Sequence, residues 1–221
     1  MSTTIAIDVA KSIFEVALSN RPGRVLKRHR FSRGQFAQFL ATEPPAIVLM
    51  EACGMAHYWG RQATGYGHRV VLLPPHAVRP YVARNKTDRA DATALLEAAR
   101  NEAIHPVPVK SVAQQALTAL HRLRSAWLAT RTARINTARG LLREFGLPIP
   151  VGARHVVPHI TALLAAPDSP VPAALRPALD AVAAELRELE RRIRALRTIS
   201  NLAPSAGGTA WPAISASRPM P

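Results

Sequence analysis

Cysteine is almost absent from this sequence, and so are long uncharged apolar runs. A single thiol, Cys53, excludes a disulfide within the chain and suits a reducing compartment. No uncharged apolar run reaches the ~20 residues that a membrane-spanning helix needs. The amino-terminal segment carries Asp8 and lacks the basic start of a signal peptide. From these absences we expect a cytoplasmic protein without a membrane span.

Acidic residues are scarce as well. The 221 residues include 14 Asp and Glu against 29 Lys and Arg, which gives a formal net charge of +15. An excess of this size favours nucleic acid as a partner, because basic side chains neutralise phosphates and release counterions. Of the basic residues 25 are arginines, a bias that GC-rich coding sequence also produces. That bias does not explain the shortage of acids.

Short apolar runs and turn signals alternate through the first hundred residues. They predict three strands over residues 4–10, 13–18 and 24–31, and then a helix that begins after Ser32. Next come a strand over 46–50 and a helix to about residue 66. They are followed by a strand over 69–73 and by helices over 77–85 and 88–100. A hairpin meander followed by alternating elements predicts an α/β domain over residues 1–104. Its mixed sheet with flanking helices is the ribonuclease H-like arrangement.

The rest of the chain is predicted to be mostly helical. The region 105–147 is expected to hold a long basic helix from Ser111 to Phe145, because this stretch has no proline and no glycine before Gly140. This helix is followed by a Pro-containing linker over 148–173, a helix over 174–198 and an aperiodic tail over 199–221. The long helix would offer nucleic acid a row of arginines: Arg122, Arg124, Arg131, Arg134, Arg139 and Arg143.

Apolar residues in the helix over 174–198 recur at alternating spacings of four and three. They are Leu175, Leu179, Val182, Leu186, Leu189, Ile193 and Leu196. Such a heptad seam favours a coiled coil or a helical hairpin. We expect copies of the chain to associate through it. The alternative is an amphipathic helix that packs on its own domain.

Four acidic residues are candidates for one catalytic site. Asp8 interrupts a buried apolar strand, where an unpaired carboxylate is costly, and Glu51 ends another strand at the edge where ligand-facing residues collect. Asp88 and Asp91, three residues apart, share one helical face. Each alone is better explained by a loop cap or a helix start. Together, oxygen ligands without His or Cys predict Mg²⁺ or Mn²⁺, and two such ions ~4 Å apart support phosphoryl transfer.

Three blocks of the sequence resemble the motifs of one transposase family. They are Ile7-Asp8-Val9-Ala10-Lys11, Glu51-Ala52-Cys53-Gly54, and Lys86-Thr87-Asp88-Arg89-Ala90-Asp91-Ala92. The family is insertion-sequence 110, the Asp-Glu-Asp-Asp transposases with a RuvC-like amino-terminal domain, and the resemblance covers residues 3–198. Ala52-Cys53-Gly54 departs from the family's usual Thr-Gly, which varies the turn and keeps the acid.

The resemblance implies a recombinase that excises and inserts a mobile element. It makes Asp8, Glu51, Asp88 and Asp91 the catalytic metal ligands for Mg²⁺, and it implies that a structured guide RNA selects the target DNA. Lys86 and Arg89 become phosphate contacts, with solvated charges as an equal alternative. The family also uses a serine nucleophile in a carboxy-terminal domain. Because Ser205, Ser215 and Ser217 lie in the aperiodic tail, we expect no serine nucleophile and a truncated or decayed copy.

Three other functions stay open at this point. A Holliday-junction resolvase or ribonuclease H would use the same acids without a serine domain. A sugar kinase or actin-like protein shares a similar sheet but needs Gly-rich phosphate loops, which Asp8-Val9-Ala10-Lys11 does not provide. A non-catalytic DNA- or RNA-binding remnant needs only the basic charge.

Overall fold

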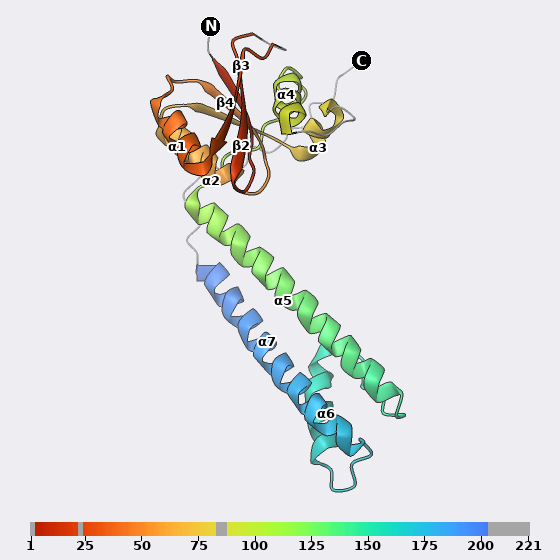
Figure 1. Cartoon of the computed structure of the whole chain (residues 1–221). Coiled ribbons are helices and arrows are strands. Elements are labelled where there is room, and N and C mark those ends of the chain that lie inside the picture. Colours follow the sequence, from red (N-terminus) through yellow and green to blue (C-terminus); the bar gives the residue numbers. More distant parts are fainter. Residues whose placement is uncertain (1–2, 22–23, 83–87, 203–221) are drawn as a thin grey trace, which may run out of the picture. The chain divides into compact units, whose positions relative to one another are not determined.

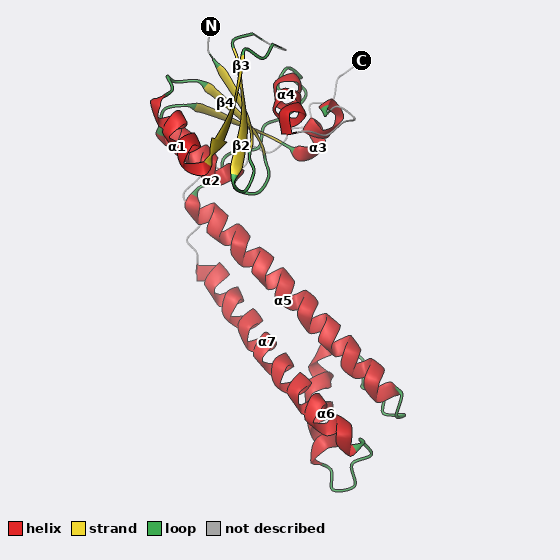
Figure 2. Ribbon diagram, in the orientation of Figure 1, coloured by secondary structure: helices red, strands yellow, loops and turns green. Residues whose placement is uncertain are grey.

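The computed structural model describes residues 3–21, 24–82 and 88–202, with the backbone alone at residues 88–90 and 198–202. The chain forms two compact units, residues 1–112 and 113–221 (Figure 1). The first unit is a sheet with helices, and the second is helical (Figure 2). Within the described ranges, none of the helices combines the length and the apolar character that a membrane crossing requires.

Five strands form one mixed sheet in the first unit, in the order β3-β2-β1-β4-β5. The first three are antiparallel neighbours, and β4 and β5 run parallel to β1. This order and these directions are the ribonuclease H-like arrangement, so the predicted fold is confirmed. The strands are β1 (Thr4–Asp8), β2 (Ile13–Ser19), β3 (Lys27–Ser32), β4 (Ile47–Glu51) and β5 (Arg69–Leu73).

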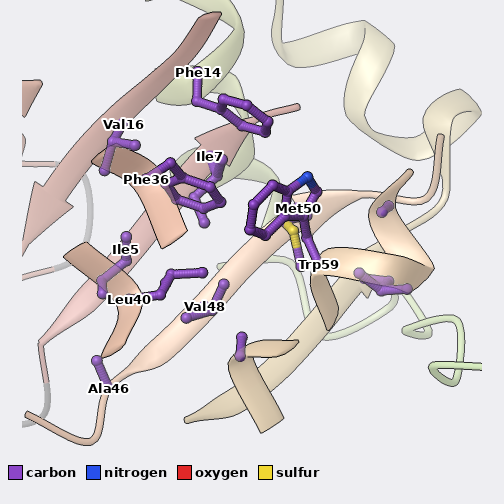
Figure 3. Close-up of a cluster of buried hydrophobic side chains, with 13 residues drawn as sticks. Ile5, Ile7, Phe14, Val16, Phe36, Leu40, Ala46, Val48, Met50 and Trp59 are labelled. Atoms are coloured by element: carbon purple, nitrogen blue, oxygen red, sulfur yellow. The ribbon is translucent and has the colours of Figure 1, made fainter. Parts of the chain in front are cut away.

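Helices cover both faces of the sheet. One face packs against α1 (Arg33–Thr42) and α2 (Ala56–Gly65) around the stacked rings of Phe14 and Phe36, with Trp59 edge-on to both (Figure 3). The other face packs against α4 (Asp88–Ala98). Because side chains alternate along a strand, a residue two positions from a core residue faces the same side as that residue.

The helix predicted over 77–85 is shorter than expected. It begins earlier, as α3 (Pro75–Val78), and continues as a single 3₁₀ turn, Arg79–Tyr81. Proline suits the first position of a helix, but Pro80 has no N–H to donate to the carbonyl of residue 76. Val82 is extended, and the last three residues of the predicted helix, 83–85, lie outside the described residues.

An extended segment, residues 105–111, runs along β5 and α2 before the long helix begins. The Val107 N–H donates to the Leu72 carbonyl, the Lys110 N–H donates to His57 Nδ1 at 3.2 Å, and Arg61 donates to the Lys110 carbonyl at 2.7 Å. These contacts hold the chain extended up to Lys110, and the helix expected from Ser111 begins at residue 112.

The second unit is built around an antiparallel pair, α5 (Val112–Arg143) and α7 (Arg176–Leu202) (Figure 1). Arg131 pairs with Glu190 at 2.9 Å, and Arg134 pairs with Glu185 at 2.7 Å. Since the numbers rise on α5 as they fall on α7, the two helices form a hairpin. The hairpin encloses a core with α6 (Val156–Ala165): Ile135, Ala138, Leu142, Ile149, Val156, Ile160, Val171, Leu179, Ala183 and Leu186.

Two expectations for this unit need correction. The segment 148–173 is not only a linker, because it contains α6. Pro158 is the third residue of that helix, where no intrahelical partner for an N–H is lost. Association of copies through the heptad seam is not supported either, since the seam is buried within the chain. Leu179 and Leu186 are 1% and 2% exposed, and Leu189, Ile193 and Leu196 are buried as well.

Candidate functional site

Asp8 and Glu51 are the last residues of two adjacent parallel strands, β1 and β4. Ile7 lies opposite Met50, so the two acids follow one residue later at the same edge of the sheet. Ala6 and Leu49, two positions before them, belong to the core beneath α4. The alternation of side chains therefore directs both carboxylates to the α4 face. Neighbouring strands lie ~4.8 Å apart, so the two acids stand close together.

The pKa of Cys53 is affected by the negative charge at this edge. Cys53 follows Glu51 by two residues and is half-buried. Burial raises the pKa of the Cys53 thiol, and the negative charges of Glu51 and Asp8 raise this pKa further. This direction agrees with the placement of Asp8 and Glu51 on neighbouring strand ends.

Helix α4 brings Asp91 toward the same edge. A hollow at the opposite edge of the sheet is lined by Thr4 and Ile47, which begin their strands, together with Ala99 beyond the carboxyl end of α4. The amino-terminal turns of α4 consequently point to the edge that carries Asp8 and Glu51. The Oδ1 atom of Asp91 is buried and has no hydrogen-bond partner among the described residues. A buried carboxylate oxygen is costly unless a cation or a hydrogen-bond donor lies next to it.

The fourth predicted ligand, Asp88, is the first residue of α4, but its side chain lies outside the described part of the chain. The same holds for the side chain of Arg89 and for the whole of Lys86. Among the side chains that are described, no three of His, Cys, Asp and Glu are grouped to hold a metal ion. The acids whose side chains are described therefore make up only part of the predicted metal-ligand set.

Glu15 is an acid at this edge that sequence reasoning missed. It lies directly opposite Asp8 in the antiparallel pairing of β1 and β2, and it is two residues from Ala17 in the core beneath α4. Its carboxylate pairs with Arg30 at 3.4 Å, and its side chain is 15% exposed. A tight turn at Lys11 and Ser12 fixes this register, so the turn was the signal that placed Glu15 opposite Asp8.

Three of the six arginines predicted to bind nucleic acid also hold the second unit together. Arg131 and Arg134 pair with acids of α7, and Arg139 donates to the carbonyls of Pro150 and Gly152 at 3.0 and 3.2 Å. On the same helix, Arg122 and Arg143 are exposed and Arg124 is partly exposed.

Residues 5–146 match the model of a transposase family, the Asp-Glu-Asp-Asp transposases of insertion-sequence 110. This chain belongs to that transposase family. The match includes all four predicted metal ligands. The family resemblance read from the three sequence motifs is confirmed.

Two curated relatives of the transposase family show how much of a longer protein the chain covers. A probable family 20 transposase of Pseudomonas aeruginosa is 41% identical over 193 residues, which are 87% of this chain and 57% of that protein. The transposase for insertion sequence element IS1328 of Yersinia enterocolitica is 43% identical over 150 residues, which are 68% of this chain and 45% of that protein. The chain spans about half the length of these relatives.

Solved structures of Thermus thermophilus RuvC are similar to part of the chain. RuvC in complex with a Holliday junction substrate is 13% identical with a TM-score of 0.35, and the similarity covers 48% of this chain and 100% of that one. A second RuvC structure gives a TM-score of 0.33.

Proposed function

We propose that the first unit is a divalent-metal-dependent nuclease domain that cuts DNA during transposition of an insertion sequence. The observation that carries this proposal is the meeting of acids at one edge of the sheet. Asp8 and Glu51 end adjacent strands on the α4 face, and α4 carries Asp91 with a buried oxygen that has no partner among the described residues. Membership of the transposase family supports the same function.

The residues at this edge fit a hard cation. Asp8, Glu51, Asp88 and Asp91 would hold it, and their oxygen donors favour Mg²⁺ or Mn²⁺ over zinc. When bound, such an ion supplies Lewis-acid stabilisation of the charge that develops on a phosphate oxygen. A cation would also supply the partner that the buried Asp91 oxygen requires.

The chain's own contribution is to hold these carboxylates in place. Asp8 and Glu51 stand on paired strands, whose backbone hydrogen bonds fix their separation, and rigid elements keep a site in its productive geometry. Lys86 and Arg89 would contact the phosphates of the DNA, close to the acids in the sequence. By family resemblance, a structured guide RNA is a second proposed partner.

Cleavage by the full chain tests the proposal. Labelled DNA carrying an element end is incubated with the protein and Mg²⁺ or Mn²⁺, and strand breaks are measured. Asp8→Asn and Glu51→Gln should each reduce cleavage by more than ~100-fold, because even residues that only support metal ligands cost ~10–100-fold. Glu97→Gln is the matched control, since Glu97 pairs with Arg100 near the other end of α4.

Each result of this assay bears on the proposal. Cleavage that survives in Asp8→Asn would show that the acids do not form the site. Metal-independent binding of DNA without any cleavage by the wild-type chain would favour the non-catalytic alternative.

A further inference from the structure

A hollow in the second unit is lined by arginines from α5, from α7 and from the 3₁₀ turn that precedes α6. The lining includes Arg131, Arg154, Arg187 and Arg194, with Glu190 among them, and the hollow has a volume of about 510 Å³. We call it the arginine hollow. It shares no residue with the acids of the first unit.

Positive charge in the arginine hollow exceeds negative charge. Residues 113–197 contain thirteen arginines and no lysine, against six acids. Glu190 is the one carboxylate among the described residues of the lining, and it is bonded to Arg131 at 2.9 Å. Gathering like charges is unfavourable unless an anion compensates them. The excess charge therefore favours an anionic ligand.

Two of these arginines donate hydrogen bonds to nearby side chains. Arg187 donates to the Thr161 hydroxyl at 2.8 Å, and Arg154 donates to His155 Nε2 at 3.0 Å. A guanidinium has five N–H donors, so one such bond orients the group and uses only part of its capacity. The Nε atom of Arg131 is buried and has no hydrogen-bond partner among the described residues. Pre-positioned guanidinium groups suit the paired oxygens of a phosphate.

We infer that the arginine hollow binds a phosphodiester group of a nucleic-acid backbone. The ligand class follows from the local charge, from the fork geometry of arginine and from a volume within the ~300–1,000 Å³ typical of ligand sites. DNA and RNA share this chemistry. The inference adds a second nucleic-acid contact that is independent of cleavage in the first unit.

Binding by charge-matched double variants tests the inference. The full chain is titrated, in EDTA so that the acids play no part, into a labelled DNA hairpin and an RNA hairpin of the same sequence at several salt concentrations. Arg154→Gln with Arg187→Gln removes two charges from the hollow. Arg191→Gln with Arg197→Gln removes two charges outside the hollow, from exposed positions on α7. Circular dichroism verifies that each variant keeps its helices.

The hollow variant should raise the Kd at least tenfold. It should also lower the slope of log Kd against log salt by about 2, roughly one for each phosphate that an arginine no longer neutralises. The control variant should change the slope by less than about 1. Equal weakening by both variants, or unchanged binding of both hairpins by the hollow variant, would overturn the inference. A stronger effect with one hairpin would support it and identify the polymer.

Chemical footprinting of the wild-type chain keeps the inference testable if the hollow variant does not fold. Phenylglyoxal modifies exposed arginines, and mass spectrometry reads the extent at each position. Bound nucleic acid should protect Arg154 and Arg187 and leave Arg191 reactive. Equal modification of all three with and without nucleic acid would contradict the inference.

Discussion

Neutralising Asp8 should stabilise the metal-free protein. Asp8 and Glu51 end adjacent strands whose backbones lie ~5 Å apart, and their side chains face the same side of the sheet. Two like charges at this distance repel by about 3 kcal/mol at an effective dielectric constant of 20. Both side chains are partly exposed, and solvent screening reduces the expected gain to about 1–2 kcal/mol. Asp8→Asn should therefore raise the free energy of unfolding in EDTA by that amount.

Excess Mg²⁺ should reverse this order of stability. A ligand that binds only the folded state stabilises it by about 2.7 kcal/mol at a hundred times its Kd. The wild-type protein gains this contribution, and Asp8→Asn loses most of it. Urea unfolding in EDTA and in excess Mg²⁺ should show the variant more stable in the first condition and less stable in the second.

The reversal separates a metal site from an ordinary acidic cluster. Glu97→Gln, at the other end of α4, should respond to Mg²⁺ as the wild-type protein does. If Asp8→Asn is less stable than the wild-type protein in EDTA and gains equally from Mg²⁺, then neither the repulsion nor the metal site exists.

Three further predictions follow from particular contacts. Glu51→Gln removes one cause of the raised pKa of Cys53, so the thiolate forms at lower pH and the alkylation profile shifts toward lower pH; an unshifted profile would separate the two residues. Leu186→Ala should destabilise the second unit by about 2–5 kcal/mol in thermal unfolding without changing the sedimentation of the chain, because the side chain is buried in its own unit. His68→Ala should cost about 1–3 kcal/mol, since the buried ring bonds the backbone of residues 40 and 46; a neutral result would mean that water replaces both bonds.

The first unit follows closely from local sequence patterns. Apolar runs separated by turn signals predict the strands, and an acid at the end of an apolar run predicts a site, because both depend only on neighbouring residues. Asp8 and Glu51 lie at one edge as expected. Glu15 depends on pairing register, which requires counting outward from a turn.

In the second unit, local sequence patterns do not predict which helices pack together. A heptad seam indicates that one face of a helix is buried, but it does not indicate which helix covers that face. Ion pairs between α5 and α7, Arg131 with Glu190 and Arg134 with Glu185, favour a partner in the same chain. Those pairs join residues more than fifty positions apart, so no local window reveals them. Helix α6 escaped prediction because proline is tolerated in a first turn.

A crystal structure of the chain grown with Mn²⁺ tests the central claim most directly. An anomalous difference map locates the ion without any assumption about its ligands. The account predicts a peak between the ends of β1 and β4 and the first turns of α4, bound by oxygens of Asp8, Glu51, Asp88 and Asp91. A map with Mn²⁺ only elsewhere, or with the Asp91 carboxylate directed away from Asp8 and Glu51, would contradict it.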